Sequence, residues 1–208
     1  MCGRFTLTAP QKLGARFPRF RFPALAPRFN IAPTQPVVGV RNTGGDDAEL
    51  LSWGLHGNIN ARAETVAVKP TFRESLRSRR AIVFADGYYE WQQRHDGKQP
   101  YFIHLLDGSP FAFAAIWDAT GCALMTTDAL GGLVTIHDRM PVILLDGAID
   151  RWLAPEPLDA VAAQALLAGG NGGALVAEPV STKVNRVAND DPSLIVPVRP
   201  PEQESLFG

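Results

Sequence analysis

Short runs of apolar, β-branched and aromatic residues recur along the chain, and glycine, aspartate or proline separates them. Runs of this length and composition, bounded by turn-forming residues, are typical of β-strands. The pattern predicts strands within residues 3–7, 37–40, 49–55, 81–91, 101–106, 111–117, 123–127 and 142–145. We therefore expect a protein built mainly on antiparallel sheet.

Helical patterning is sparser and covers three segments. Residues 71–80 offer Thr71 as an N-cap with Glu74 three positions later, the arrangement of a capping box. Residues 148–154 form a short candidate helix, and residues 158–169 end on a glycine, as helices often do. Many strands and few helices together predict an α+β fold.

The length and composition fit one compact domain. The chain has 208 residues, of which 46% are hydrophobic, which suits a sizeable single core. We expect a domain over residues 1–198 and a flexible tail over residues 199–208, which is proline-led and polar. No stretch reaches the roughly 18 apolar residues of a membrane span, and the start has no signal-peptide pattern, so we expect a cytoplasmic protein without membrane contact.

The chain holds two cysteines, Cys2 and Cys122. Two cysteines are too few for a disulfide framework, and their separation matches no metal-ligand spacing. No set of histidine, aspartate and glutamate residues has such spacing either. We expect neither a metal nor a cofactor.

The charge is divided unevenly along the sequence although the net charge is −1. Residues 1–80 hold thirteen basic and five acidic residues, a net of +8, whereas residues 81–208 hold seven and sixteen, a net of −9. Such a division suggests one surface that faces a polyanion. The alternative is that the two halves intermingle on folding and the asymmetry disappears.

Cys2 follows the initiating methionine, so removal of Met1 would leave it with both a free α-amine and a thiol. Their reference pKa values are about 7.7 to 8.0 and about 8.5, so both nucleophiles are partly available near neutral pH. Such a pair can capture an aldehyde, first as a Schiff base and then as a thiazolidine ring. It can equally attack an amide carbonyl with the amine as base. In a third interpretation, Cys2 is a small structural residue at the start of a strand.

Residues 59–65, INARAET, alternate in character. In a strand, Asn60, Arg62 and Glu64 would share one face, with two alanines on the other. An amide, a cation and a carboxylate opposite small residues suggest the wall of a pocket. Ordinary alternation at a protein surface gives the same pattern.

Two further residues could move protons. Glu90 lies between Tyr89 and Trp91 in a hydrophobic stretch, and desolvation there would raise its pKa toward neutrality, as a general acid requires. A solvent-facing Glu90 would have no such role. His137 precedes Arg139 by two residues and titrates near neutral pH, although a lone histidine can also be purely structural.

The order of several short motifs resembles the SOS-response-associated peptidase (SRAP) family, whose members process abasic sites in single-stranded DNA. The motifs are MCGRF, FNIAPTQ, WGL, NARAET, ADGYYEW, IHDRMPVIL and VSTKVN, and the resemblance extends from Met1 to about Pro197. It implies a barrel-like, mainly antiparallel sheet body with flanking helices. It also implies a lyase-like activity in the DNA damage response: a covalent thiazolidine crosslink between the protein and the ring-opened sugar, which shields the lesion. Self-removal of Met1 is the implied peptidase activity.

The resemblance assigns roles by motif match. The implied catalytic residues are Cys2 as the nucleophile, Asn60 to position the terminus and sugar, and Glu90 with His137 to move protons. The implied DNA contacts are Arg4, Asn30, Arg62 and Arg139. Three proton movements, in sugar opening, dehydration and ring closure, suit two groups of different basicity.

The chain departs from the family between WGL and NAR. Family members usually carry a tryptophan-bearing insertion there, whereas only residues 56–59, HGNI, intervene in this chain. Because stacking of a base on an aromatic ring contributes about 1–3 kcal/mol, we expect weaker noncovalent binding or a changed strand preference. The flanking catalytic positions are intact.

The tail sequence QESLF looks like the short peptide by which bacterial proteins dock on the replication sliding clamp. Its candidate contacts are Gln203, Leu206 and Phe207. The expected partners are therefore single-stranded DNA with abasic sites and this clamp, and a monomer is expected.

Two other functions remain open on the sequence. One is an N-terminal-nucleophile amidohydrolase, since glutamine amidotransferase domains also begin MCG. The other is a noncatalytic DNA-binding module in which Cys2 is structural. Glutamine hydrolysis would reveal the first, and DNA association that is insensitive to Cys2→Ser would reveal the second.

Overall fold

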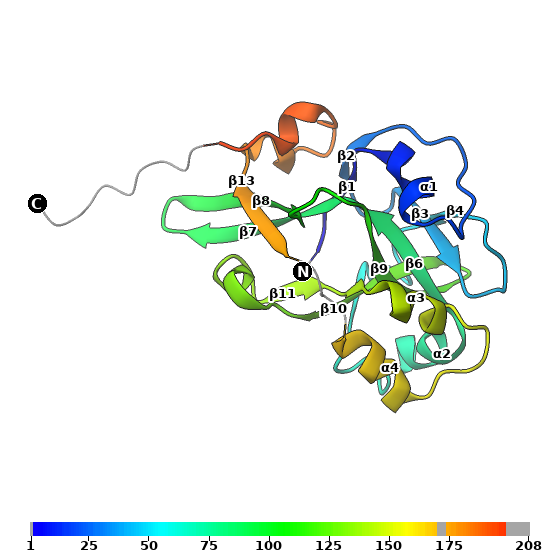
Figure 1. Ribbon diagram of the computed structural model, residues 1–208. Coiled ribbons are helices and arrows are strands. Elements are labelled where there is room, and N and C mark those ends of the chain that lie inside the picture. The colour runs from blue at the N-terminus through cyan, green and yellow to red at the C-terminus, as the bar shows by residue number, and fades with distance from the viewer. Residues whose placement is uncertain (1, 170–173, 199–208) are drawn as a thin grey trace, which may run out of the picture.

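A computed structural model describes residues 2–169 and 174–198, and it contains two sheets. The first sheet has five strands in the order β13-β8-β7-β1-β2, and all of its neighbours are antiparallel. The strands are β13 (Leu175–Pro179), β8 (Gly97–Leu105), β7 (Gly87–Arg94), β1 (Phe5–Leu7) and β2 (Arg28–Ile31). In Figure 1 the β7–β8 hairpin projects to one side of the molecule.

The second sheet has eight strands. Its main path is β11-β10-β9-β6-β3-β4, while β12 pairs with β9 and β5 pairs with β10. The strands are β11 (Arg139–Pro141), β10 (Gly121–Asp128), β9 (Phe111–Asp118), β6 (Arg80–Ala85), β3 (Pro36–Arg41), β4 (Glu49–Ser52), β12 (Ile143–Leu144) and β5 (Asn60–Arg62). Only the β5–β10 pair of this sheet is parallel.

The α+β prediction is confirmed, but the sheets do not close into a barrel. Each sheet runs between two edge strands, β13 and β2 in one and β11 and β4 in the other. The run expected as a single strand over residues 81–91 is two strands, β6 and β7, which belong to different sheets. The chain changes sheets at Asp86, the one residue between them.

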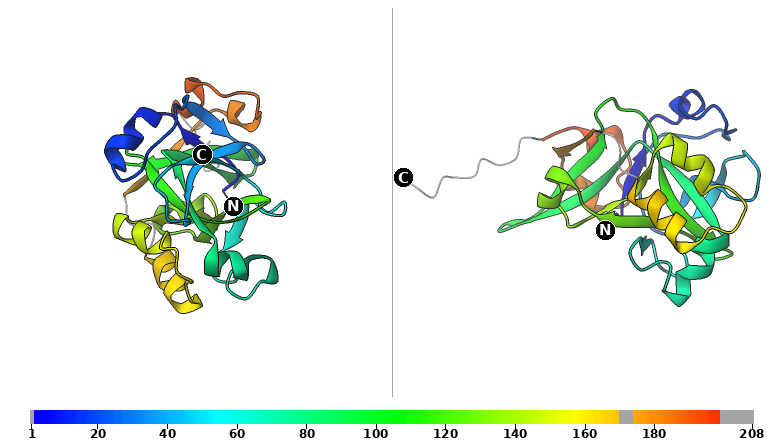
Figure 2. Two further views of the ribbon diagram at one scale, coloured as in Figure 1. Left: turned by 90° about the vertical axis from the view of Figure 1, so that its right-hand side faces the viewer. Right: turned by 60° about the horizontal axis from the view of Figure 1, so that its bottom comes forward.

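Four α-helices lie among the described residues: α1 (Leu13–Arg16), α2 (Pro70–Ser78), α3 (Asp146–Trp152) and α4 (Ala160–Ala168). Helices α2, α3 and α4 lie together at one end of the molecule (Figure 2). The predicted N-cap of α2 is wrong: Lys69 caps the helix and Pro70 is its first residue, a position that suits the fixed φ of proline. Helix α4 starts after Asp159, which accepts a hydrogen bond from the Ala162 amide at 2.7 Å. None of the helices described is long and apolar enough to cross a membrane.

The main core lies between the two sheets. Phe5 of β1 packs edge-on against Trp53 and Phe113, with ring centroids 5.0 and 5.6 Å apart. The other face of the first sheet is also covered, by a C-terminal segment that contains the 3-10 helices η3 (Thr182–Asn185) and η4 (Pro192–Ile195). This segment and the sheet enclose a second hydrophobic cluster, which we call the second cluster. It consists of Tyr89, Phe102, Val180, Val184 and Leu194. Both faces of β7 are therefore buried from Gly87 to Glu90.

Asp86 fastens the start of the chain to the point where the sheets diverge. Its buried carboxylate accepts hydrogen bonds from the Thr6 hydroxyl at 2.6 Å, the Thr8 amide and hydroxyl at 2.6 and 2.8 Å, and the Ala9 amide at 2.9 Å. Hydrogen bonds to an ionised carboxylate are among the stronger ones. The position of β1, and hence of the residues before it, depends on this carboxylate.

The expected tail, residues 199–208, and its candidate clamp contacts lie outside the described residues. The clamp interaction through Gln203, Leu206 and Phe207 stays a prediction from the sequence.

Replacing Asp86 by alanine leaves buried donors without an acceptor, so we expect the free energy of unfolding to fall by about 2–4 kcal/mol. Urea denaturation at pH 7 measures the change. Asp96→Ala, at the exposed turn between β7 and β8, is the matched control and should change the value by less than about 0.5 kcal/mol. An Asp86→Ala loss no larger than that of the control would contradict the anchoring role.

Candidate active site

Cys2 is completely buried just before β1. Its carbonyl oxygen accepts a hydrogen bond from the Asn60 side-chain amide at 2.8 Å, and its thiol donates to the Arg4 carbonyl at 3.8 Å. Burial is the main cause that raises the pKa of the Cys2 thiol well above its usual value, and the charge of Glu90 adds to it. The sulfur is therefore a neutral thiol that must lose its proton in the step in which it reacts.

The strand that carries Asn60 is held by the second sheet. In the parallel β5–β10 pair, Asn60 lies opposite Leu124. Ala61 and Ala63 are buried, as the alternation predicts, but β5 ends at Arg62 and Glu64 lies in the following turn. Asn60 therefore links the second sheet to Cys2, which lies just before strand β1 of the first sheet.

Glu90 is only 3% exposed although it carries a carboxylate. Burial raises its pKa to about 7. Desolvation is the expected cause, but Tyr89 and Trp91 do not supply it, because their side chains belong to the opposite face of β7 and contact the second cluster. Glu90 shares its face with Tyr88, toward the main core. At neutral pH this group can both give and accept a proton.

His137 lies between the 3-10 helix η2 (Gly131–Thr135) and β11. Its Nδ1 accepts a hydrogen bond from the Arg139 backbone amide at 3.0 Å and lies 2.9 Å from the Asp138 carboxylate. These two contacts require different protonation of Nδ1. We favour the amide contact because an N–H group can only donate, whereas Asp138 is largely exposed and hydrated. Burial lowers the pKa of His137, which agrees with a neutral ring.

Glu90 and His137 line one open pocket. Its other lining residues are Arg4, Trp91, Lys98 and Asn185. The Trp91 indole donates to the Asn185 side chain at 2.7 Å and so joins β7 to the C-terminal segment. An acid–base pair beside two cations suits a substrate that carries phosphate.

Lys98 is a residue of this pocket that sequence reasoning missed. It lies in β8 opposite Gln93, close to the hairpin turn, and nothing in its local pattern sets it apart. Only the hairpin pairing brings it to Glu90. Asn185 belongs to the motif VSTKVN, but the sequence suggested no role for it.

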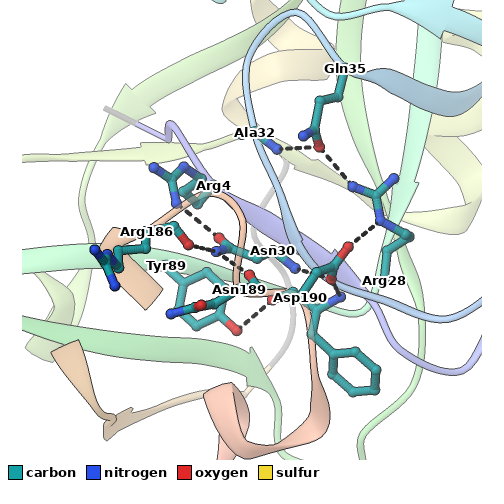
Figure 3. A network of polar contacts seen from close by, with 10 residues as sticks. Arg4, Arg28, Asn30, Ala32, Gln35, Tyr89, Arg186, Asn189 and Asp190 are labelled. Carbon is teal, nitrogen blue, oxygen red and sulfur yellow. Dashed lines mark hydrogen bonds and ion pairs between the residues drawn. The ribbon is translucent and has the colours of Figure 1, made fainter. Parts of the chain in front are cut away.

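Arg4 and Asn30 anchor the C-terminal segment (Figure 3). Arg4 donates to the Asn30 side-chain oxygen at 3.0 Å and to the Val184 carbonyl at 2.8 Å. The Asn30 side-chain nitrogen lies within hydrogen-bonding distance of three carbonyl oxygens, those of Val184, Arg186 and Asn189, at 2.8 to 3.2 Å. Asp190 accepts from the backbone amide of Asn30 at 2.9 Å. Together these contacts hold one wall of the pocket in place.

Two of the four expected DNA contacts have a different setting from the one expected. Asn30 has no exposed surface, and its side chain is occupied by the C-terminal segment. The Arg139 side chain is 7% exposed and forms ion pairs with Glu64 at 2.9 Å and Asp128. Both side chains are therefore buried and engaged within the scaffold, and their DNA contacts stay a prediction. Arg62 is exposed, and Arg4 reaches the pocket.

Part of the charge asymmetry of the sequence is neutralised on folding. Five arginines of the basic first segment form ion pairs with acidic residues: Arg16 with Asp146, Arg19 with Asp46 and Asp150, Arg21 with Asp47, Arg28 with Asp190, and Arg41 with Glu49. Some of these partners come from the acidic second half. The two halves therefore intermingle at Arg16, Arg19 and Arg28, whereas Arg21 and Arg41 pair within the first half.

No group of three or more histidine, cysteine, aspartate or glutamate residues within 2–169 and 174–198 is arranged to hold a metal ion. The pocket itself offers the carboxyl group of Glu90 and the imidazole of His137.

The fold and the pocket together define an α+β protein in which a cysteine at the start of the chain meets a buried carboxyl group. The description "SOS response associated peptidase (SRAP)" belongs to a family model that matches residues 1–187. The chain belongs to this family.

Curated relatives cover most of the chain. It is 38% identical over 192 residues to the abasic site processing protein YedK of Escherichia coli (strain K12), which covers 82% of this chain and 85% of that protein. It is 35% identical over 224 residues to the abasic site processing protein YoqW of Bacillus subtilis (strain 168), with 94% and 99% covered.

Solved structures share the fold. A phage-related protein from Bordetella bronchiseptica is 32% identical, with a TM-score of 0.73 over 87% of this chain and 95% of that chain. A protein from Bacteroides thetaiotaomicron has a TM-score of 0.82 at 24% identity, over 95% and 100%. The latter likeness concerns the fold alone.

Asn30→Ala should loosen the C-terminal segment without unfolding the sheets. Losing the hydrogen bonds of a buried amide costs about 2 kcal/mol, so amide hydrogen exchange in residues 182–195 should accelerate by about tenfold or more. Exchange in β6 should stay unchanged. Asn58→Ala, which alters a turn between Leu55 and Asn58, is the control. Equal exchange rates in the two variants would contradict the anchoring role of Asn30.

The stability of the protein should depend on pH through Glu90. Its folded pKa of about 7 exceeds its usual value of 4.5, so the folded state binds the proton more tightly. Stability is therefore lost as pH rises through this interval, by up to about 3 kcal/mol. Glu90→Gln should gain stability relative to the wild type as pH rises from 5 to 8, measured by urea denaturation. A difference that does not vary with pH would refute the shift.

Proposed function

We propose that this protein processes abasic sites in single-stranded DNA by forming a covalent thiazolidine crosslink through Cys2 once Met1 has been removed. The observation that carries the proposal is the hydrogen bond from Asn60 to the Cys2 carbonyl, which fixes the terminal residue beside Glu90. The names of the relatives, abasic site processing proteins, support the same substrate.

The first step joins the α-amine of Cys2 to the aldehyde of the ring-opened sugar. The amine nitrogen forms a bond to the aldehyde carbon, and the resulting carbinolamine loses water to give an imine. Departure of hydroxide is assisted by a proton, and Glu90, with a pKa of about 7, is half protonated at neutral pH. His137, whose pKa is lowered by burial, is neutral at this pH. It accepts the proton that the amine nitrogen loses as the imine forms.

The second step closes the ring. The Cys2 sulfur bonds to the imine carbon, the electron pair of the C=N bond moves to nitrogen, and one proton passes overall from sulfur to nitrogen. Because burial keeps the thiol protonated, a base must take that proton as the C–S bond forms. We assign this role to the carboxylate form of Glu90, whose charge acts on the Cys2 thiol.

DNA contact is assigned to the cations that remain available. Arg4 and Lys98 line the pocket, while Arg62, Lys183 and Arg186 are exposed and have no ion-pair partner among the residues that the structure describes. We propose that these groups bind the phosphates that flank the abasic site.

The short connection before Asn60 is closed on itself. The backbones of Leu55 and Asn58 exchange hydrogen bonds at 2.9 and 2.8 Å, with Gly57 in a positive-φ conformation. The turn carries no tryptophan, and its one ring, the His56 imidazole, lies 2.7 Å from the Asp118 carboxylate. The proposed binding therefore relies on phosphate contacts, and it includes weaker noncovalent affinity for a single strand.

Removal of Met1 is the activity to which the family description "peptidase" would refer in this chain. The bond to be cleaved joins Met1 to Cys2. The Cys2 thiol and the Glu90 carboxyl group would therefore serve this reaction as well. We include this self-processing in the proposal as the step that generates the free α-amine.

Incubation of the Met1-processed protein with single-stranded DNA that contains one abasic site tests the proposal. We expect a band that resists heat and denaturant, and Cys2→Ser or an undamaged strand should abolish it. Asn60→Ala should slow its formation at least about tenfold by releasing the terminus. The rate should fall above pH 7, where Glu90 loses its proton, and again in acid, where His137, whose pKa burial lowers, becomes charged.

Absence of the band with a confirmed free Cys2 would refute crosslinking. Glutamine hydrolysis that depends on Cys2 would then favour the amidohydrolase alternative. DNA binding that Cys2→Ser leaves unchanged, without any covalent product, would favour the noncatalytic alternative.

A further inference from the structure

Tyr88 carries a buried hydroxyl group without a hydrogen-bond partner among the described residues. Its side chain is fully buried in the main core, where its ring packs edge-on against Phe113 at 6.2 Å. A buried polar group that is left unpaired destabilises the folded state. Such a group in a native fold calls for a partner that arrives in another state of the protein.

The groups that interact with Tyr88 include Cys2 and Glu90, which take part in the proposed reaction. Strand alternation puts Tyr88 and Glu90 on one face of β7, and Tyr88 pairs across the strands with Phe5, three residues after Cys2. Burial is the main cause that raises the pKa of Tyr88 well above its usual value, and electrostatic interactions with Cys2 and Glu90 add to it. The phenol therefore keeps its proton and can act only as a neutral donor toward an anion.

The Asn60 side-chain oxygen is a second buried atom without a partner in the described part of the chain. Asn60 already contacts Cys2 through its nitrogen. Two unpaired polar atoms therefore belong to residues around the same cysteine. Their coincidence points to Cys2 as the place where the missing hydrogen bonds form.

We propose that Tyr88 is a further catalytic residue, whose hydroxyl donates a hydrogen bond to the Cys2 sulfur as the thiol adds to the imine. This inference rests on the proposed function. The bonds made and broken are those of ring closure, in which the C–S bond forms and the thiol proton leaves the sulfur. Tyr88 keeps its own proton throughout and stabilises the negative charge that develops on sulfur.

The test compares Tyr88→Phe with Tyr89→Phe in the Met1-processed protein. Tyr89 is the matched control, because it is the neighbouring tyrosine on the opposite face and its hydroxyl donates to the Phe29 carbonyl at 2.8 Å. Imine formation is followed by trapping with cyanoborohydride, and ring closure by the product that resists this reagent. Both are measured with abasic DNA and with glyceraldehyde, a small aldehyde that needs no DNA contacts.

For Tyr88→Phe we expect ring closure to slow about tenfold while imine trapping stays within about twofold of the wild type. Its melting temperature should be unchanged or a few degrees higher, because an unpaired hydroxyl is removed. Tyr89→Phe should have a lower melting temperature and a normal rate of ring closure. If Tyr88 had only a structural role, its replacement would not slow ring closure in a protein that is no less stable.

Ring closure by Tyr88→Phe at the wild-type rate would overturn the inference, as would equal slowing in both variants. Glyceraldehyde separates this failure from failure of the proposed function. If wild-type Cys2 forms a thiazolidine with glyceraldehyde but no crosslink with abasic DNA, the proposed substrate is wrong, and the Tyr88 comparison is still decided by glyceraldehyde.

Discussion

The site depends on the hydrogen bonds that Asp86 makes to the first strand. Chain termini are ordinarily the least ordered part of a protein, yet here the residue expected to do the chemistry is the second of the chain. Asp86 joins residues 6–9 to the point where the two sheets separate, and Phe5 adds an aromatic anchor in the core between them. With those restraints in place, one hydrogen bond from Asn60 suffices to fix Cys2.

Burial then sets the protonation of the site. Desolvation favours the neutral form of every ionisable group, so it raises the pKa of the Cys2 thiol and of Glu90 and lowers that of His137. The result is a neutral thiol beside a half-ionised carboxyl group and a neutral imidazole at pH 7. One physical cause thus prepares both an acid and a base.

The C-terminal segment completes the pocket from the far end of the sequence. It covers the outer face of the first sheet through a small apolar cluster, and Asn30 and Arg4 bind its carbonyl groups. Through Asn185, which holds the Trp91 indole, this segment also shapes the wall beside Glu90. Polar residues that could have been read as DNA contacts therefore serve to keep the pocket in one shape.

The sequence by itself determined most of the elements and the candidate residues: alternation and turn residues predicted most strands, and the ordered motifs singled out Cys2, Asn60, Glu90 and His137. Only the tertiary structure decided the change of sheet at Asp86 and the burial of Arg139 and Asn30. The same holds for the arrival of Lys98 at the pocket. The physical reason is that local patterns report periodicity along one strand, whereas burial and ion pairing depend on which distant segments meet. Arg4 finds the Val184 carbonyl because two sheets and a returning C-terminal segment bring them together, and no local pattern records that meeting.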